Sequence, residues 1–203
     1  MAAAKPRRAA GKAKKKGVVV TREWLVDNGA CMAGRAWFDD RYPGGKASLG
    51  SLLRALDPDE HPSWAWWLAT RFPGGGFAWR IRAAVVYASE FGPSDKDLVA
   101  RVAVLAPQGS FTERLAVLHR YRGQFSPSYY YDLAMAGGVE ATFAQRRRAI
   151  TESDLYNKAG WLFQLALVSP VGTLKQRLAA CRDDSDRQKV MERHGNNRKA
   201  GKR

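Results

Sequence analysis

The segment 63–76, SWAWWLATRFPGGG, contains a complete helix together with its start and stop signals. Ser63 is expected to cap the helix, because its hydroxyl can accept a hydrogen bond from a free N–H group of the first turn. The proline and glycines at 73–76 end it, since proline lacks an N–H group and glycine favours turns. Apolar side chains recur every three or four residues and predict one buried face. That face consists of Trp64, Trp67, Leu68 and Phe72, with Trp66 turned away from it.

Similar signals recur along the chain from Thr21 onward and predict further helices. Their expected ranges are 22–28, 30–42, 49–56, 78–91, 95–105, 112–122, 128–135, 139–150, 152–168 and 171–182. The expected N-caps are Thr21, Ser94, Ser110 and Thr151. Only Val18–Val20 has a strand-like pattern, and the sequence leaves open whether it pairs. We therefore predict an all-α fold, a multi-helix bundle.

Two of these helices carry apolar faces that place particular residues. In the helix over 30–42, one face is formed by Cys31, Gly34, Trp37 and Phe38, and Cys31 is interpreted as a core residue because free cysteine is commonly buried. In the helix over 171–182, the inward stripe is formed by Leu174, Leu178 and Cys181. This second pattern leaves Lys175, Arg177 and Arg182 facing solvent.

One short pattern occurs twice. Residues 37–45, WFDDRYPGG, recur as residues 67–75, WLATRFPGG, with matching Trp, Arg, Pro and both glycines. An arginine near a helix C-terminus followed by proline and glycine is typical of a helix end. We interpret the pattern as a shared helix end, and the sequence leaves open whether it records a duplication. Two copies are too few to indicate a stacked-repeat fold, which needs at least three.

The net charge of +15 on these 203 residues is concentrated at the two ends. Residues 1–17 contain seven Lys or Arg and no acid, and residues 187–203 contain seven basic residues and one acid. The middle, 18–186, has 20 basic and 18 acidic residues. The ends also lack the apolar content needed to fold alone. We therefore predict a disordered basic arm over 1–17, one helical globular domain over 18–186 and a basic tail over 187–203.

Flexible cationic arms bind polyanions by releasing counterions, without reading sequence and with a steep dependence on salt. Nucleic acid, either DNA or RNA, is the polyanion that this charge favours. The alternative interpretation is that the arms aid solubility or serve as a localisation signal. The arm and tail residues predicted to contact phosphates are Lys5, Arg7, Arg8, Lys12, Lys14, Lys15, Lys16, Arg193, Arg198, Lys199, Lys202 and Arg203.

Two runs inside the domain extend this prediction. Arg146, Arg147 and Arg148 are consecutive, so on a helix they fan around the axis and at least two must reach solvent, where they can contact phosphates. Tyr129, Tyr130 and Tyr131 are also consecutive, and an exposed tyrosine offers a ring for an unpaired base. The competing interpretation is that one or two tyrosines fill the core and that the arginines pair with Glu140, Glu152 or Asp154.

Several classes of site are excluded. Cys31 and Cys181 are too few for a disulfide framework, although a single bridge between them stays open, and the three histidines lack zinc-ligand spacing. His119 is interpreted as structural. Gly74-Gly75-Gly76 is followed by no Lys-Ser or Lys-Thr, so it is not a phosphate loop. We predict a non-enzymatic protein without cofactor or metal. The longest apolar runs are too short to span a membrane, and no signal peptide begins the sequence, so we expect an intracellular protein.

A family resemblance covers residues 21–72. Asn28-Gly29-Ala30-Cys31, followed by Gly34, Trp37 and Phe38 and then by Trp64-Ala65-Trp66-Trp67-Leu68, resembles a helical module of uncharacterised bacteriophage and prophage proteins. The resemblance implies a viral origin, with the protein in the host cytoplasm or the virion, and brings no activity.

Two hypotheses follow from these observations. The first is a non-enzymatic, sequence-independent nucleic-acid-binding protein, associated with a phage genome or its packaging, whose basic tails bind phosphates. The alternative is a protein-interaction module, such as a viral structural or host-modulating component, because tryptophan and tyrosine are enriched at binding hot spots.

Overall fold

The computed structural model describes residues 18–72, 75–91 and 96–195. These residues are mainly helical, with one two-stranded sheet, so the predicted all-α class is confirmed. The predicted basic arm, 1–17, and the end of the predicted tail, 196–203, lie outside the described residues. The chain divides into two compact units between Ala55 and Leu56, where the sequence predicted one domain over 18–186.

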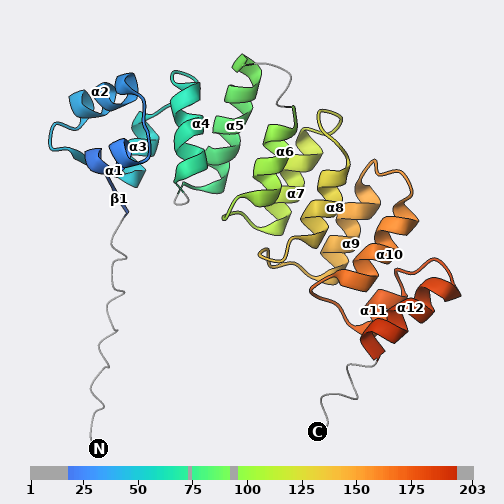
Figure 1. Ribbon diagram of the computed structural model, residues 1–203. Coiled ribbons are helices and arrows are strands. Elements are labelled where there is room, and N and C mark those ends of the chain that lie inside the picture. Colours follow the sequence, from blue (N-terminus) through green and yellow to red (C-terminus); the bar gives the residue numbers. More distant parts are fainter. Residues whose placement is uncertain (1–17, 73–74, 92–95, 196–203) are drawn as a thin grey trace, which may run out of the picture. The chain divides into compact units, whose positions relative to one another are not determined.

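The first unit is small and combines three helices with the sheet (Figure 1). Its elements are β1 Val19–Thr21, α1 Arg22–Asp27, α2 Met32–Arg41, β2 Lys46–Ser48 and α3 Leu49–Ala55. The strand-like segment does pair, because Val20 lies opposite Ala47 in an antiparallel register and both are buried. The Thr21 hydroxyl caps α1, as predicted, by accepting a hydrogen bond from Trp24 N at 3.2 Å.

The prediction that Cys31 packs in the core is wrong. Its side chain is exposed, and its Sγ atom accepts a hydrogen bond from Gly34 N at 3.4 Å at the start of α2. Cys31 is therefore the N-cap of this helix rather than part of its buried face, which Phe38 provides. Both Cys31 and Cys181 are free thiols.

The second unit is a succession of helices that pack on one another in chain order (Figure 1). Its elements are α4 Pro62–Arg71, α5 Phe77–Phe91, α6 Lys96–Leu105, α7 Phe111–Arg120, α8 Ser128–Met135, α9 Phe143–Glu152, α10 Lys158–Val168, α11 Leu174–Leu178 and α12 Asp184–Gly195. Helix α8 also contacts α6 and α10, and α10 contacts α12. This pattern divides the unit into four helix pairs, α4–α5, α6–α7, α8–α9 and α10–α11, followed by α12. Such stacked pairs are typical of repeat proteins.

Several predicted boundaries need correction. Residues 187–195, assigned to a basic tail, belong to α12, whose Val190 is completely buried against the core. Ser63 lies inside α4, which begins at His61 as N-cap, and Thr151 lies inside α9. Trp66 was expected to face away, yet it packs on the core with its ring centroid 5.8 Å from that of Tyr87. The buried residues of α4 are instead Pro62, Ala65, Leu68 and Ala69.

One arginine recurs at the same place in each helix pair. Arg80, Arg114, Arg146 and Arg177 lie in the first turns of the second helices, and each is at most 7% exposed. Each guanidinium points back to the end of the first helix of its own pair and donates hydrogen bonds to main-chain carbonyl oxygens. We call these four residues the clamp arginines.

Arg114 makes the most complete clamp. Its Nε donates to Gly109 O at 2.9 Å, and its Nη1 donates to Ala103 O at 2.9 Å and Val104 O at 2.7 Å. Its Nη2 donates to Ala106 O and, at 2.9 Å, to Gln108 O. The last four carbonyls of a helix lack partners within the helix, and an arginine has five N–H donors to supply. All five donors of Arg114 are used: two bind the last turn of α6, and three bind the loop after it.

The other three clamps repeat this arrangement. The Nε atoms of Arg80, Arg146 and Arg177 donate to the carbonyl five residues earlier, at 3.2, 3.4 and 3.1 Å. Their Nη1 atoms donate to the last turn of the preceding helix, at Ala69, Ala134 and Ala166. The clamp therefore fixes the angle between the two helices of every pair, because one rigid group binds both the loop and the helix end.

Burial of the clamp arginines has an electrostatic cost that the carbonyls offset. Desolvation lowers the pKa of all four guanidinium groups from the usual arginine value. That usual value is so high that the groups stay charged at neutral pH. A buried charge is tolerated when polar groups solvate it, and a cation at a helix C-terminus also meets the negative end of the helix dipole. The sequence predictions that Arg146 binds phosphates and that Arg177 faces solvent are therefore wrong.

A second contact links successive helix pairs through loop glycines. Gly109, at φ +99°, lies in the loop of the second pair, and a Cβ atom there would lie 2.7 Å from the ring of Phe77 in the first pair. Gly172, at φ +114°, has the same relation to Phe143, at 2.5 Å. The aromatic ring that opens one second helix thus rests on the loop of the next pair.

Replacing Gly109 with alanine is expected to lower the free energy of unfolding by about 2–4 kcal/mol, because the new Cβ meets Phe77 and the backbone must hold a positive φ. Gly137→Ala is the matched control, since Gly137 lies in the loop of the next pair with open space around it, and we expect a change within about 0.5 kcal/mol. Urea unfolding followed by circular dichroism measures both. Equal effects of the two substitutions would contradict the proposed packing.

Candidate nucleic-acid interface

The sequence-predicted phosphate contacts fall into three groups in the structure. Those outside the described residues are Lys5, Arg7, Arg8, Lys12, Lys14, Lys15, Lys16, Arg198, Lys199, Lys202 and Arg203. Arg146 is inside the protein as a clamp. Arg147 and Arg148 on α9 and Arg193 on α12 have exposed side chains. Among the described residues, the surface therefore offers three of the predicted cations.

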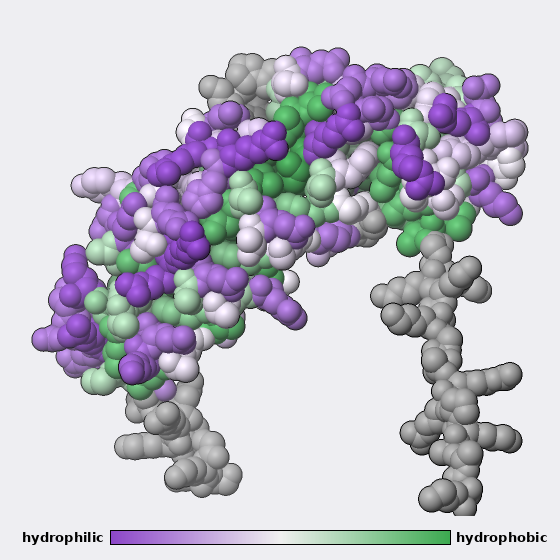
Figure 2. Space-filling view, turned by 180° about the vertical axis from the view of Figure 1, so that it is seen from behind, coloured by the Kyte–Doolittle hydropathy of each residue, from purple (hydrophilic) through white to green (hydrophobic). Residues whose placement is uncertain are grey.

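Removing the clamp arginines from the surface changes its charge balance. Apart from these four arginines, the described part of the second unit contains 14 basic and 14 acidic residues. In Figure 2, hydrophilic residues cover much of the visible helix surface, and hydrophobic residues show between them. The repeat scaffold thus has almost no surface excess of cations, and any cationic site on it must be local.

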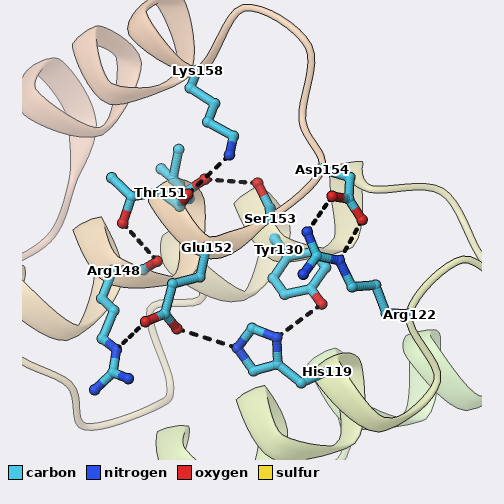
Figure 3. A network of polar contacts seen from close by, with 10 residues as sticks. His119, Arg122, Tyr130, Arg148, Thr151, Glu152, Ser153, Asp154 and Lys158 are labelled. Atoms are coloured by element: carbon cyan, nitrogen blue, oxygen red, sulfur yellow. Dashed lines mark hydrogen bonds and ion pairs between the residues drawn. The ribbon is translucent and has the colours of Figure 1, made fainter.

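One such local site surrounds His119 at the meeting of α7, α8 and α9 (Figure 3). Its Nδ1 lies 3.3 Å from the hydroxyl of Tyr130, and its Nε2 lies 3.3 Å from Glu152 Oε2. The other Glu152 oxygen accepts a hydrogen bond from Arg148 Nε at 2.5 Å. The Arg148 guanidinium lowers the pKa of Glu152 below its usual value, so this carboxylate is charged at neutral pH. His119 is therefore held by two helices, as its structural interpretation requires.

A second ion pair joins the same region to the loop between α9 and α10. Arg122, just beyond α7, donates from Nε and Nη2 to both carboxylate oxygens of Asp154 (Figure 3). This contact lowers the pKa of Asp154 and raises that of Arg122. The Lys158 ammonium donates to Thr151 O at 2.9 Å across the same loop. Arg122, Arg148 and Lys158 therefore add three cations to this region, where Glu152 and Asp154 supply two carboxylates.

Side-chain hydrogen bonds to the main chain fix the loop that carries Asp154. Ser153 is buried, and its hydroxyl donates to Ile150 O at 2.7 Å and accepts from Leu155 N at 3.2 Å. Asn157 adopts a left-handed conformation, φ +54°, and its side chain caps α10 by accepting from Gly160 N at 3.3 Å. Between them Leu155 is buried, whereas Tyr156 is 93% exposed. The fold thus holds the Tyr156 backbone in place and leaves its ring in solvent.

Tyr156 stands at the edge of a shallow groove, which we call the aromatic groove. Its walls come from α8, α10 and the loop before α10, and its lining includes Tyr131, Asp154, Tyr156, Trp161 and Gln164. The rings of Tyr131 and Trp161 are in contact, with centroids 4.5 Å apart. The Trp161 indole donates through Nε1 to Tyr156 O at 3.0 Å, which fixes both residues relative to each other. Asp154 lines the aromatic groove and also forms the ion pair with Arg122 that Figure 3 shows.

The predicted tyrosine run is only partly at this site. Tyr130 is buried in the core, as the competing interpretation held for one or two of the three. Tyr129 is half-buried and lies edge-on to Phe125, 5.9 Å between centroids, while Tyr131 lines the aromatic groove. Arg148 pairs with Glu152, again as that interpretation held, and Asp154 pairs with Arg122 instead.

Sequence reasoning missed Arg122, Tyr156, Lys158 and Trp161. The predicted helix over 152–168 placed the last three inside one continuous helix, whereas α10 begins at Lys158. The signal that could have shown this is Asp154-Leu155-Tyr156-Asn157, in which asparagine precedes a helix as an N-cap. That interpretation would have placed Tyr156 in a loop.

Other kinds of site are constrained by two observations on the described residues. No group of three or more His, Cys, Asp or Glu side chains lies close enough together to hold a metal ion. None of the described helices combines the length and the apolar character needed to cross a bilayer. Comparison with models of known protein families, with curated proteins and with solved structures gives no match to this chain.

Proposed function

We propose that this protein is a non-enzymatic nucleic-acid-binding protein in which stacked helix pairs form a scaffold and the two chain ends supply most of the phosphate contacts. The observation that carries the proposal is the division of charge. Four arginines of the repeat unit are turned inward as clamps, and its remaining acidic and basic residues are equal in number. Apart from the four clamps, the surplus of positive charge therefore belongs to the ends, where residues 1–17 alone contain seven Lys or Arg and no acid.

Cationic segments of this composition suit a polyanion better than a folded partner. They contain mainly alanine, glycine, lysine and arginine with few large apolar side chains, so they suit contacts to phosphates, which carry no sequence information. Exposed Arg147, Arg148 and Arg193 on the scaffold can add to the same contacts. The sequence resemblance implies a phage origin, and the nucleic acid bound would then be the phage genome, free or during its packaging.

The salt dependence of binding tests this proposal. The full chain, purified after nuclease treatment and a high-salt wash, is titrated into labelled single-stranded and duplex oligonucleotides between 50 and 200 mM salt. If six to ten phosphates are neutralised, the affinity is expected to fall about 10³- to 10⁵-fold over this range. Failure to bind at 50 mM salt, or an affinity that does not change with salt, would overturn the proposal. Fluorescence anisotropy provides the measurement.

A further inference from the structure

The aromatic groove has the parts of a site for an unpaired nucleobase. An exposed ring at the edge, a wall made of two further rings and an amide in the lining combine stacking surfaces with hydrogen-bonding groups. Stacking on aromatic side chains is the means by which proteins bind single strands without reading sequence, because every base has a flat face. The Gln164 amide can both donate to and accept from a base edge.

The exposure of Tyr156 needs an explanation that its own fold does not provide. Its ring is 93% exposed, whereas Leu155 beside it is buried. The carbonyl of Tyr156 is bound by Trp161, and the next residue holds a left-handed conformation that costs free energy. The loop is therefore fixed in a form that presents this ring, which lowers the entropy cost of stacking a ligand on it.

The surrounding charges favour an anionic ligand over a proline-rich peptide, the other common occupant of aromatic grooves. Arg122 binds Asp154 on the groove wall, and Arg148 pairs with Glu152 in the same polar network (Figure 3). Lys158 lies between the lining residues Asn157 and Gly160 in the sequence, and its ammonium donates to Thr151 O. Asp154 is already neutralised by Arg122. The three cations outnumber the two carboxylates of this region by one, and a net positive charge near an exposed ring suits single-strand binding.

We infer that the aromatic groove binds an unpaired base of single-stranded nucleic acid, stacked on Tyr156, while Arg122 and Lys158 lie near its phosphates. This inference rests on the proposed function and gives it a substrate class, since a base held in a duplex has no free face for Tyr156. It predicts a preference for single strands that the basic ends, which contact only phosphates, do not provide.

The test compares Tyr156→Ala with the wild-type full chain on a labelled single strand and on a hairpin duplex of equal length. We expect the substitution to weaken binding to the single strand about 5- to 100-fold and binding to the duplex less than twofold. Phe91→Ala is the matched control, because Phe91 is also an exposed aromatic residue, at the end of α5, and should change neither affinity. Tyr156→Phe should retain the single-strand affinity.

A strand in which every base is absent completes the experiment, because it keeps the phosphates and removes the stacking partner. Wild type and Tyr156→Ala should bind this strand equally. Equal losses on single strand and duplex, or an unchanged single-strand affinity, would overturn the inference while leaving the proposed function standing. No binding to any oligonucleotide by wild type would overturn the proposed function. A proline-rich peptide whose affinity depends on Tyr156, with strand binding unaffected by Tyr156→Ala, would also overturn the inference.

Discussion

Replacing Arg114 with methionine is expected to lower the free energy of unfolding by about 3–5 kcal/mol, the largest stability effect of any single substitution that we predict. Methionine fills much of the same volume but supplies no donor, so the carbonyls of Ala103, Val104 and Ala106 lose their partner inside the protein. An unsatisfied buried acceptor costs about 1–3 kcal/mol, and water can reach only some of these positions after the protein relaxes. Chemical denaturation followed by circular dichroism is the measurement.

Two further variants separate the clamp from ordinary effects of losing an arginine. Arg120→Met removes an exposed cation from the same helix and should change stability by no more than about 0.5 kcal/mol. Arg114→Lys restores the charge but not the planar set of five donors, so we expect it to recover less than half of the loss. If Arg114→Lys were as stable as wild type, positive charge alone would account for the contact, and the clamp geometry would be irrelevant.

The helices themselves could be predicted well from local signals, because each carries its own start, stop and apolar stripe. The expected helix over 128–135 coincides with α8, and Thr21 and Ser110 are N-caps as predicted. Errors occur where two signals compete. Residues 152–157 continue the apolar spacing of α10, so periodicity extended the helix through a loop that Ser153 and Asn157 fix by side-chain hydrogen bonds.

The clamp arginines could not be assigned from charge and periodicity. An arginine is normally placed on the solvent side, and among three consecutive arginines nothing local distinguishes Arg146 from Arg147. Arg146 turns inward because the last turn of α8 and the loop after it present three carbonyl groups within its reach, and this depends on tertiary structure. A longer comparison along the sequence would have helped. Leu-Ala or Val-Ala occurs at 68–69, 102–103, 133–134 and 165–166, each followed 11 or 12 residues after the alanine by a clamp arginine.

The repeated pattern at 37–45 and 67–75 indicated a shared type of helix end. In both copies the arginine lies over the tryptophan four residues earlier, Arg41 over Trp37 and Arg71 over Trp67. The two segments are similar helix ends, but α2 is followed by a strand and α4 by a helix with a clamp. The helix end at 67–75 therefore belongs to the stacked helix pairs and the one at 37–45 does not, and only the sequence after the proline distinguishes them.

The aromatic groove was not predictable, because Tyr131, Tyr156 and Trp161 meet only through packing of α8 on α10.

Replacing the seven cations of residues 1–17 with glutamine is expected to weaken nucleic-acid binding at least about 10³-fold near physiological salt, because each phosphate contact releases a counterion. The residues are Lys5, Arg7, Arg8, Lys12, Lys14, Lys15 and Lys16. The slope of log affinity against log salt should also become shallower, by about 0.9 for each duplex phosphate that loses its cation. Titrations of the full-length variant across a salt series measure both quantities.

A shuffled version of residues 1–17, with the same composition in a different order, is the matched control for this variant. It should bind as wild type does, since contacts to phosphates carry no sequence information. Loss of binding on shuffling would show that the order of residues matters, and hence that the segment recognises a defined surface rather than a polyanion. An unchanged affinity and slope in the glutamine variant would show that residues 1–17 do not contact the phosphates, which would leave the cations of 196–203 and those of the scaffold. On the scaffold, the acidic and basic residues outside the clamps are equal in number, so only local clusters such as that around Arg148 and Arg122 could provide such contacts.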